Sequence, residues 1–496
     1  MVIISTNKGK VKGVQEVDHQ HFFGIPYAKP PIEDLRFQEP HEMDFWEGIK
    51  DTSKFKPIPP QAYPEDPPID QEESEDCLYL NIWTPASDDK KRPVMFWIYG
   101  GGFLIGAGSR PRVEGKHLCV FGNVVVVTFN YRLGVLGFLN LPNIPSNLGI
   151  LDQIAALTWV KENIVNFGGD PDNITIFGES AGGMSVALLL SISRARGLFH
   201  KAIIQSGAAN PRMFEPDEAR TGSLEFISNL NIDLDHLDEL KKIPITTIIK
   251  AQFKITGTFL DSKIKPFRAF VDGNLIPKQP LELLSKGMGN YVPLIIGYNN
   301  EELGVLANIL KDSNKLKRKL IQKVMYSRLL KSGIEKAKLD QLVNTYKEEL
   351  KIKYPDNPYK YLSYLLSDSM FRMPILRQIE AQLNHQSNIY CYIFEYNSPK
   401  FGYAMHTFEI PFVFGTLNTT DIAKGAIEDT TEAKSLRKVL MDTWVSFAKN
   451  GSPNNKNIPT WLPYDINRRF TMILAINSRL ETAPMDNLRK SWEGIH

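Results

Sequence analysis

A serine between two glycines, in Gly178-Glu179-Ser180-Ala181-Gly182, is the strongest chemical signal in this chain. The apolar, β-branched run Ile174 to Phe177 before it predicts a strand, and the apolar run Met184 to Leu190 after it predicts a buried helix. A serine at such a junction lies on a sharp turn at positive φ, and the strand and helix pack so closely there that Gly178 and Gly182 must lack side chains. Ser180 is therefore the candidate nucleophile, and the alternative is a glycine-rich turn whose serine only caps a helix.

A serine hydroxyl needs a general base, and that base needs a carboxylate to orient it. When a nucleophile lies on a strand–turn–helix junction, the order along the chain is serine, acid, histidine. The run Val292 to Gly297 predicts a later strand, which two acids follow, Glu301 and Glu302, and spacing does not choose between them. The next predicted strand, Tyr390 to Tyr396, is followed by His406, which we interpret as the base.

Three glycines, Gly100 to Gly102, follow the predicted strand Pro93 to Ile98 after one residue, Tyr99. Glycines in a row expose backbone amides, and two of these amides can converge with the amide of Ala181 on one negatively charged oxygen. The alternatives are a flexible hinge and a phosphate cradle. The cradle is disfavoured because no Gly-Lys-Ser/Thr follows the triplet.

The elements that must position these residues are strands alternating with helices, which is typical of an α/β protein. The run Val124 to Asn130 is apolar on both faces and predicts a central strand covered by helices on each side, and Lys201 to Gln205 predicts another strand. Helical spacing of apolar residues predicts helices over Leu151 to Ile164 and Leu436 to Lys449, and Phe470 to Ile476 predicts a late strand.

Two long, mainly helical regions, at about 210–291 and 306–388, interrupt this alternation. Because they follow strands at the end of the sheet where α/β proteins bind ligands, we expect them to form the walls of an active-site gorge. We expect residues 1–496 to form one domain, since no repeat or linker divides them. The segment Lys311 to Lys353 is locally basic, and we interpret it as a solvated helix face in preference to a surface for an anionic partner or a membrane.

Composition excludes several classes of protein. With 496 residues, 43% of them hydrophobic, and a net charge of +2, the chain can build a large core and gives no electrostatic case for nucleic acid. The segment Met1 to Lys8 lacks the features of a signal peptide, and no apolar run is long enough to span a bilayer, so we expect a cytoplasmic protein without a membrane partner. Three cysteines and nine histidines show no metal-binding spacing, and we expect no metal and no cofactor.

These residues resemble the carboxylesterase type B family of the α/β-hydrolase fold, and most of all its bacterial para-nitrobenzyl esterases. The likeness covers nearly the whole chain. Besides the serine motif it rests on the run Glu75 to Pro85, which matches the family's second signature, on Phe23 to Ala28, on Asn130 to Gly134 and on Leu148 to Gln153. The resemblance implies a large, mostly parallel central sheet flanked by helices.

Within the family pattern, the resemblance implies that Glu302 is the acid, that Gly101, Gly102 and Ala181 form the oxyanion hole, and that Glu179 and Ser206 support the site. In exported family members the cysteine at the position of Cys77 has an upstream partner, but here the upstream stretch Pro57 to Gln61 contains no cysteine. This departure agrees with a reducing compartment. The same loop lacks the tryptophan with which cholinesterases bind choline, so a cation cage is not expected.

The hypothesis is therefore a serine carboxylesterase of broad small-ester specificity, in which Ser180, His406 and Glu302 form a triad and water hydrolyses an acyl-enzyme. Its partners would be a small ester and water, and the chain would act as a monomer or a small homo-oligomer, presumed bacterial from the likeness. Two alternatives stay open at this point. One is a non-catalytic binding protein of the same fold, and the other is an acyltransferase.

Overall fold

The computed structural model describes residues 1–61, 71–209, 215–256, 266–419 and 425–495. The strands in these residues are β1 Val2–Ser5, β2 Lys10–Gln15, β3 Gln20–Pro26, β4 Ile49–Asp51, β5 Tyr79–Thr84, β6 Arg92–Ile98, β7 Val125–Phe129, β8 Gly169–Glu179, β9 Lys201–Gln205, β10 Leu294–Asn299, β11 Ile389–Phe394, β12 Phe470–Leu474 and β13 Arg479–Thr482. The α-helices are α1 Lys116–Gly122, α2 Gly134–Phe138, α3 Leu148–Asn163, α4 Ala181–Ser191, α5 Pro216–Asn229, α6 Ile245–Thr256, α7 Pro280–Ser285, α8 Gly304–Asp312, α9 Lys315–Lys331, α10 Lys336–Lys353, α11 Lys360–Ser367, α12 Met373–Gln382, α13 Ile410–Phe414, α14 Thr431–Asn450 and α15 Asp486–Lys490.

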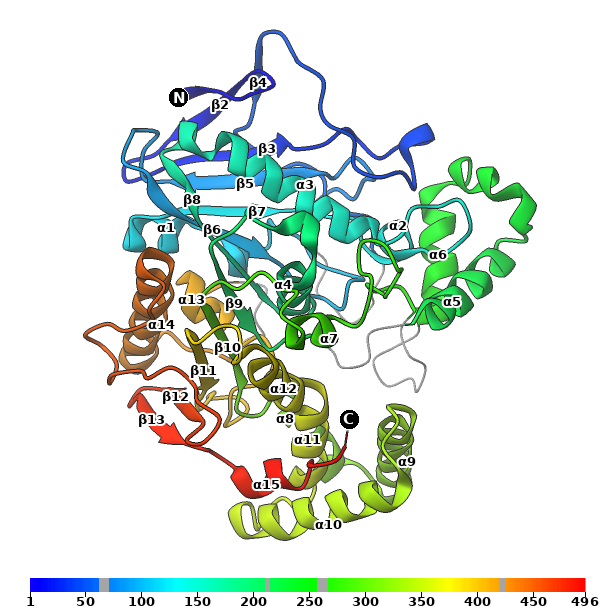
Figure 1. Ribbon diagram of the computed structural model, residues 1–496, viewed down its shortest axis with the longest axis vertical. Helices are drawn as coiled ribbons and strands as arrows, with labels where there is room; N and C mark the ends of the chain where they lie inside the picture. The colour runs from blue at the N-terminus through cyan, green and yellow to red at the C-terminus, as the bar shows by residue number, and fades with distance from the viewer. Residues whose placement is uncertain (62–70, 210–214, 257–265, 420–424, 496) are drawn as a thin grey trace.

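Thirteen strands of the described residues form one sheet, in the order β1-β2-β3-β5-β7-β6-β8-β9-β10-β11-β12-β13, with β4 beside β2 (Figure 1). The pairs from β7 to β12 are all parallel, whereas β1, β2, β3, β5 and β7 pair antiparallel and β13 returns antiparallel along β12. Helices α1 and α14 lie on one face of the sheet, and α3, α4 and α12 lie on the other. The expected α/β-hydrolase architecture is confirmed.

The central strands match their predictions because they are buried on both faces. In β7 and β9 every residue is buried, which is why each one reads as a short, continuous apolar run. The antiparallel strands at the N-terminal edge were not predicted, and β1 and β2 alternate exposed and covered residues over only a few positions. Such short, half-exposed strands give a weak signal in the sequence, because alternation over so few positions does not distinguish a strand from a loop.

The predicted helices are present with small extensions at their ends. The C-terminal helix α14 begins earlier than predicted because the Thr430 side chain caps it, accepting a hydrogen bond from the Ala433 amide. It ends where the sequence indicated, since Gly451 takes the left-handed conformation at φ 71° directly after Asn450. Part of the predicted insertion at 210–291 lies outside the described residues.

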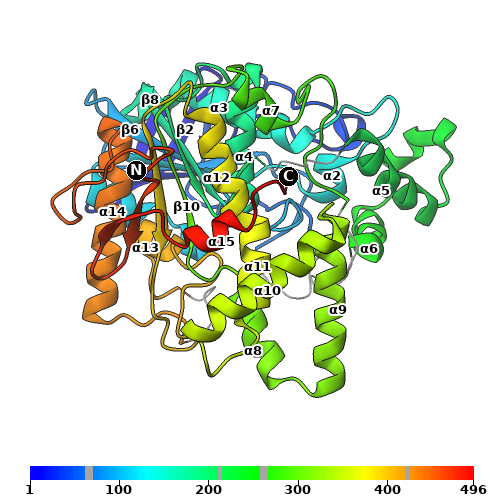
Figure 2. The same ribbon diagram turned by 60° about the horizontal axis from the view of Figure 1, so that its bottom comes forward.

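The region 306–388 contains the helices α8 to α12 and has a hydrophobic cluster of its own. Residues of α8, α9, α10 and α11 pack together, and Trp492 and Ile495 near the C-terminus join them. Figure 2 shows these four helices as a group beside the sheet, with α15 alongside. No helix among the described residues is both long enough and apolar enough to cross a membrane.

Candidate active site

Ser180 lies on the tight turn between β8 and α4. Its φ of 56° and ψ of −123° are strained for a residue with a side chain, and the turn is fixed because the Ser180 amide donates to the Gln205 carbonyl over 2.9 Å. A Cβ on Gly178 would lie 2.6 Å from the Gly182 backbone, and a Cβ on Gly182 would overlap the Ile98 carbonyl oxygen. Both glycines are therefore required by close packing, as the sequence indicated.

His406 meets one of the two candidate acids. The Nδ1 atom of His406 lies 2.6 Å from Oε2 of Glu302, and the His406 amide donates to the Glu302 carbonyl over 3.0 Å. The other oxygen of Glu302, Oε1, accepts hydrogen bonds from the Ser206 hydroxyl at 2.5 Å and from the Asn299 amide at 2.8 Å. With both oxygens engaged in a buried site, the Glu302 carboxylate has one fixed orientation.

Glu301, the other candidate acid, points to a different group of side chains. Its carboxylate forms an ion pair with Lys360 and accepts hydrogen bonds from the hydroxyls of Tyr354 at 3.1 Å and Tyr364 at 3.4 Å. Both glutamates are buried, so burial alone does not distinguish them. The two glutamates differ in the direction of their side chains, since adjacent residues on a turn project to different sides.

Ser180 and His406 are not joined by a hydrogen bond, and among the described residues none bonds to the Ser180 hydroxyl. The outward nitrogen of His406, Nε2, lies instead 3.1 Å from Oε1 of Glu179, the residue before the serine. The His406 side chain is 23% exposed, and the Phe371 ring packs against its imidazole at 4.8 Å between centroids. The imidazole is therefore held against Glu179, the residue before the serine, and against an aromatic ring.

Carboxylates dominate the electrostatics around His406. Burial lowers the pKa of His406, but the neighbouring Glu179 and Glu302 outweigh it and raise that pKa to about 9. Burial, opposed in part by the His406 charge, raises the pKa of Glu179 to about 8. Burial also raises the pKa of Glu409, which bonds to Gln205 and Asn299. The site thus favours a positive charge on the imidazole.

The first of the three glycines after β6 lies directly beside the serine. A Cβ on Gly100 would come within 3.0 Å of the Ser180 Cβ, which places this backbone against the Ser180 turn. Gly101 at φ 110° and Gly102 at φ 64° take conformations that favour glycine. The amides of Gly101, Gly102 and Ala181 donate to no oxygen of the described residues, so they are available to a ligand.

Sequence reasoning missed several residues that contact the predicted ones. Glu409 is fully buried and links Asn299 to Gln205, and its only signal was its place three residues after His406. Lys360 is 59 residues from Glu301 along the chain, so no local pattern connects the two. In the described part of the chain, no group of three or more His, Cys, Asp or Glu residues could hold a metal ion.

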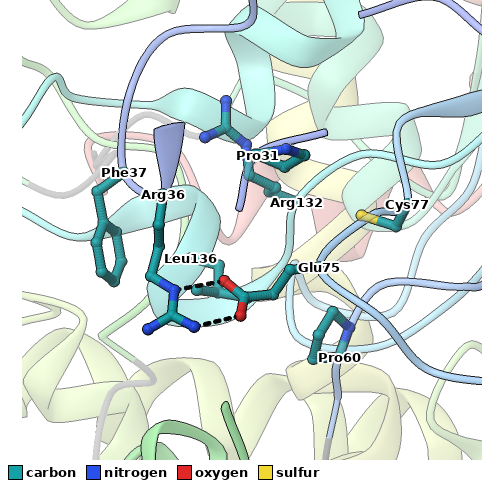
Figure 3. A pocket seen from close by; sticks show the side chains of 8 residues that line it. All are labelled: Pro31, Arg36, Phe37, Pro60, Glu75, Cys77, Arg132 and Leu136. Carbon is teal, nitrogen blue, oxygen red and sulfur yellow. Dashed lines mark hydrogen bonds and ion pairs between the residues drawn. The ribbon is translucent and has the colours of Figure 1, made fainter. Parts of the chain in front are cut away.

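A second cluster of charges lies in the N-terminal region. Arg36 and Glu75 are joined by two hydrogen bonds, Nε to Oε1 at 2.7 Å and Nη2 to Oε2 at 2.5 Å (Figure 3). The pair borders a cavity of about 10 Å³, the space of roughly one water molecule, which Cys77 and Arg132 also line. Because Arg36 also donates to the carbonyls of Leu240 and Ile243, this pair ties the N-terminal segment to the chain before α6.

Comparison with known proteins identifies the family. A family model described as the carboxylesterase family matches residues 1–491. The chain belongs to the carboxylesterase family. It is 36% identical to the para-nitrobenzyl esterase of Bacillus subtilis (strain 168), over 98% of each chain, and 33% identical to a human cocaine esterase, over 94% of this chain and 84% of the relative.

Solved structures agree with this assignment. A PNB esterase structure superposes with a TM-score of 0.87 at 35% identity, covering 99% of both chains. A carboxylesterase of Geobacillus stearothermophilus superposes with a TM-score of 0.86 at 33% identity, covering 99% of this chain and all of the other. The predicted family and the predicted activity are confirmed, and the chain is a carboxylic ester hydrolase.

Proposed function

We propose that Ser180, His406 and Glu302 act as nucleophile, general base and orienting acid in the hydrolysis of carboxylic esters. The observation that carries this proposal is the 2.6 Å contact between His406 Nδ1 and Glu302 Oε2, in an imidazole whose Nε2 contacts Glu179, the residue before a serine on a strained turn. A carboxylate at Nδ1 orients the imidazole so that Nε2 is the nitrogen that accepts a proton. Strain at the serine keeps its hydroxyl exposed at the start of α4.

In the proposed reaction the Ser180 oxygen attacks the ester carbonyl while His406 Nε2 takes its proton. For this step Nε2 must exchange its contact with Glu179 for one with Ser180. The resulting imidazolium then donates its proton to the leaving alkoxide, and the acyl group stays on the serine. A water molecule, deprotonated by the same histidine, then attacks the acyl carbon; the bond to the Ser180 oxygen breaks, the histidine returns its proton to that oxygen, and the carboxylic acid leaves.

The charge on the tetrahedral oxygen would be stabilised by the amides of Gly101, Gly102 and Ala181. These amides have no partner among the described residues, and the Ala181 amide lies at the N-terminus of α4, where the helix dipole favours negative charge. Losing one such donor costs about 3 kcal/mol of transition-state stabilisation in comparable enzymes. The role of Ser206 is to hold Glu302 through its hydroxyl, and that of Glu179 is to favour the protonated imidazole.

The finer features of the activity are also proposals. We infer that the chain accepts a broad range of small esters, since relatives named for para-nitrobenzyl and cocaine esters match at similar identity. We also infer that the helical insertions at 210–291 and 306–388 form the walls of an active-site gorge. We infer that residues 1–496 form one domain. We also infer that the chain acts as a monomer or a small homo-oligomer, because all three proposed triad residues come from one chain. A bacterial, cytoplasmic setting is supported by the Bacillus relative and by three cysteines that are buried and unpaired.

The decisive experiment follows the release of para-nitrophenol from a para-nitrophenyl ester. The native chain should give a burst of about one equivalent or steady turnover, and Ser180→Ala should give neither. Ser193→Ala, an exposed serine beyond the end of α4, is the matched control and should behave as the native chain. Full activity in Ser180→Ala would overturn the proposal.

A further inference from the structure

The helix α11 is short and buried, yet it carries polar residues at helical spacing. Lys360, Ser363 and Ser367 are all less than a tenth exposed, and they recur at intervals of three and four residues, which places them on one face. A buried lysine is costly unless it is paired. The partners of these three side chains therefore indicate the role of this face of α11.

All three side chains reach the residues on either side of Glu302. The Lys360 ammonium forms an ion pair with Glu301, immediately before it. The Ser367 hydroxyl accepts from the Leu303 amide at 3.1 Å, and the Ser363 hydroxyl donates to the Leu303 carbonyl at 2.8 Å. The polar face of α11 thus holds the side chain of the residue before Glu302 and the backbone of the residue after it.

Lys360 also reaches the loop that carries His406. Its ammonium lies 4.2 Å from the centre of the Tyr403 ring, three residues before the histidine. Two backbone hydrogen bonds join the same two loops, from the Glu301 amide to the Ala404 carbonyl at 3.2 Å and from the His406 amide to the Glu302 carbonyl at 3.0 Å. One ammonium group therefore contacts both loops at the point where they are already bonded to each other.

We propose that Lys360 is a positioning residue for the reaction, and that with Ser363 and Ser367 it fixes Glu302 against His406 from the helical region. This inference rests on the proposed triad. It makes α11 a support of the chemistry, in addition to any part the helical region has in forming a cavity wall. Lys360 acts through Glu301 and Tyr403 and touches no reacting atom.

The test uses Lys360→Met, which keeps the length of the side chain and removes its charge. A misplaced orienting group costs on the order of tenfold to hundredfold in turnover, so kcat should fall by that factor while KM stays within about twofold. The acid limb of the kcat/KM profile should also move to lower pH, because a looser Glu302 raises the pKa of His406 less. Native values of kcat and of this profile in Lys360→Met would overturn the proposal.

A double variant separates positioning from the cost of an unpaired buried charge. In Glu301→Gln/Lys360→Met neither charge remains, so a penalty due only to the unpaired Glu301 would disappear. Positioning predicts that the double variant stays slow and keeps the shifted profile. Recovery of the native kcat would mean that Lys360 merely neutralises Glu301, and the proposal would fail.

Two controls complete the design. Arg36→Met/Glu75→Gln removes a buried ion pair that touches neither loop; it should lower the melting temperature and leave the pH profile in place. If Lys360→Met does not fold, Ser363→Ala/Ser367→Ala loosens the same backbone with smaller changes and should shift the profile in the same direction; a native profile there overturns the proposal. Loss of activity in Ser180→Ala tests the triad itself, independently of all these variants.

Discussion

The Nε2 atom of His406 lies 3.1 Å from Oε1 of Glu179, the residue before Ser180. In the proposed reaction this is the nitrogen that accepts a proton from Ser180, so Glu179 would compete with the serine for it. Both partners have a raised pKa, about 9 for His406 and about 8 for Glu179. Because the charge of each group shifts the pKa of the other, the protonation state of both depends on the contact between them.

Glu179→Gln should shift the pH dependence of hydrolysis. His406 must be neutral to act as a base, so kcat/KM in the native chain should fall as pH drops through a value above 6.5, the ordinary pKa of histidine. Removing the Glu179 carboxylate lowers the pKa of His406, and the acid limb should move to lower pH. Steady-state kinetics from about pH 5 to about pH 10 would measure this shift.

The exposed Glu348→Gln on α10 is the matched control for charge, and its profile should equal that of the native chain. A Glu179→Gln profile that coincides with the native one would show that Glu179 does not act on the imidazole. An acid limb near pH 6.5 or lower in the native chain would contradict the raised pKa of His406.

Glu302→Gln should lower kcat by about 10⁴, because an amide at Nδ1 leaves the imidazole in the wrong tautomer while the geometry is retained. Ser206→Ala removes one of two donors to Glu302 Oε1 and leaves the Asn299 amide, so its effect should be about tenfold. The comparison is made by kcat on one ester at the pH optimum. The reverse ranking of the two variants would move the proposed acid away from Glu302.

Gly102→Ala tests the proposed oxyanion hole. Among the described residues other than its chain neighbours, no atom lies within 4 Å of the Cβ that this change would add. Any loss therefore comes from the backbone, whose φ of 64° strains alanine by about 1–2 kcal/mol. Gly197→Ala is matched, since Gly197 also has a positive φ, 80°, and open space. Both variants should lose similar stability in urea, and only Gly102→Ala should lose kcat. Equal kcat in the two variants would exclude the Gly102 amide from the reaction.

Much of the fold could be predicted from the sequence because buried parallel strands and close glycine contacts leave local patterns. Ser180 stands out since packing forces Gly178 and Gly182 to be glycines within two positions of it. The edge strand β1 leaves no such pattern, because it is short and half exposed. Local patterns thus describe the centre of the sheet better than its edge.

The candidate site was harder to predict where it depends on direction or on distant contacts. Glu301 and Glu302 are neighbours of one type, and only the turn decides which carboxylate faces His406. Lys360 at the start of α11 contacts Glu301, which follows β10, and the helices α8 to α10 lie between these two residues along the chain. Sequence periodicity carries no information about such a pairing.

Stability should also depend on pH through Glu179 and His406. The folded pKa of each group lies above its ordinary value, 4.5 for Glu179 and 6.5 for His406, so the folded chain binds more protons than the unfolded chain in between. Their contribution is therefore complete below about pH 4.5 and is lost as pH rises through about 8 and 9. We expect the free energy of unfolding to fall across this window.

Glu179→Gln should make that fall shallower, because the variant has no carboxyl group to deprotonate and a less basic His406. Urea unfolding from about pH 6 to about pH 9 measures the slope, with equal m-values required for a fair comparison. The free energy of unfolding is compared, and not the urea midpoint alone, since glutamine also changes the interactions beside the imidazole. Parallel slopes in the native chain and the variant would mean that Glu179 ionises in the folded chain as it does in the unfolded one, which its burial and its carboxylate neighbours oppose.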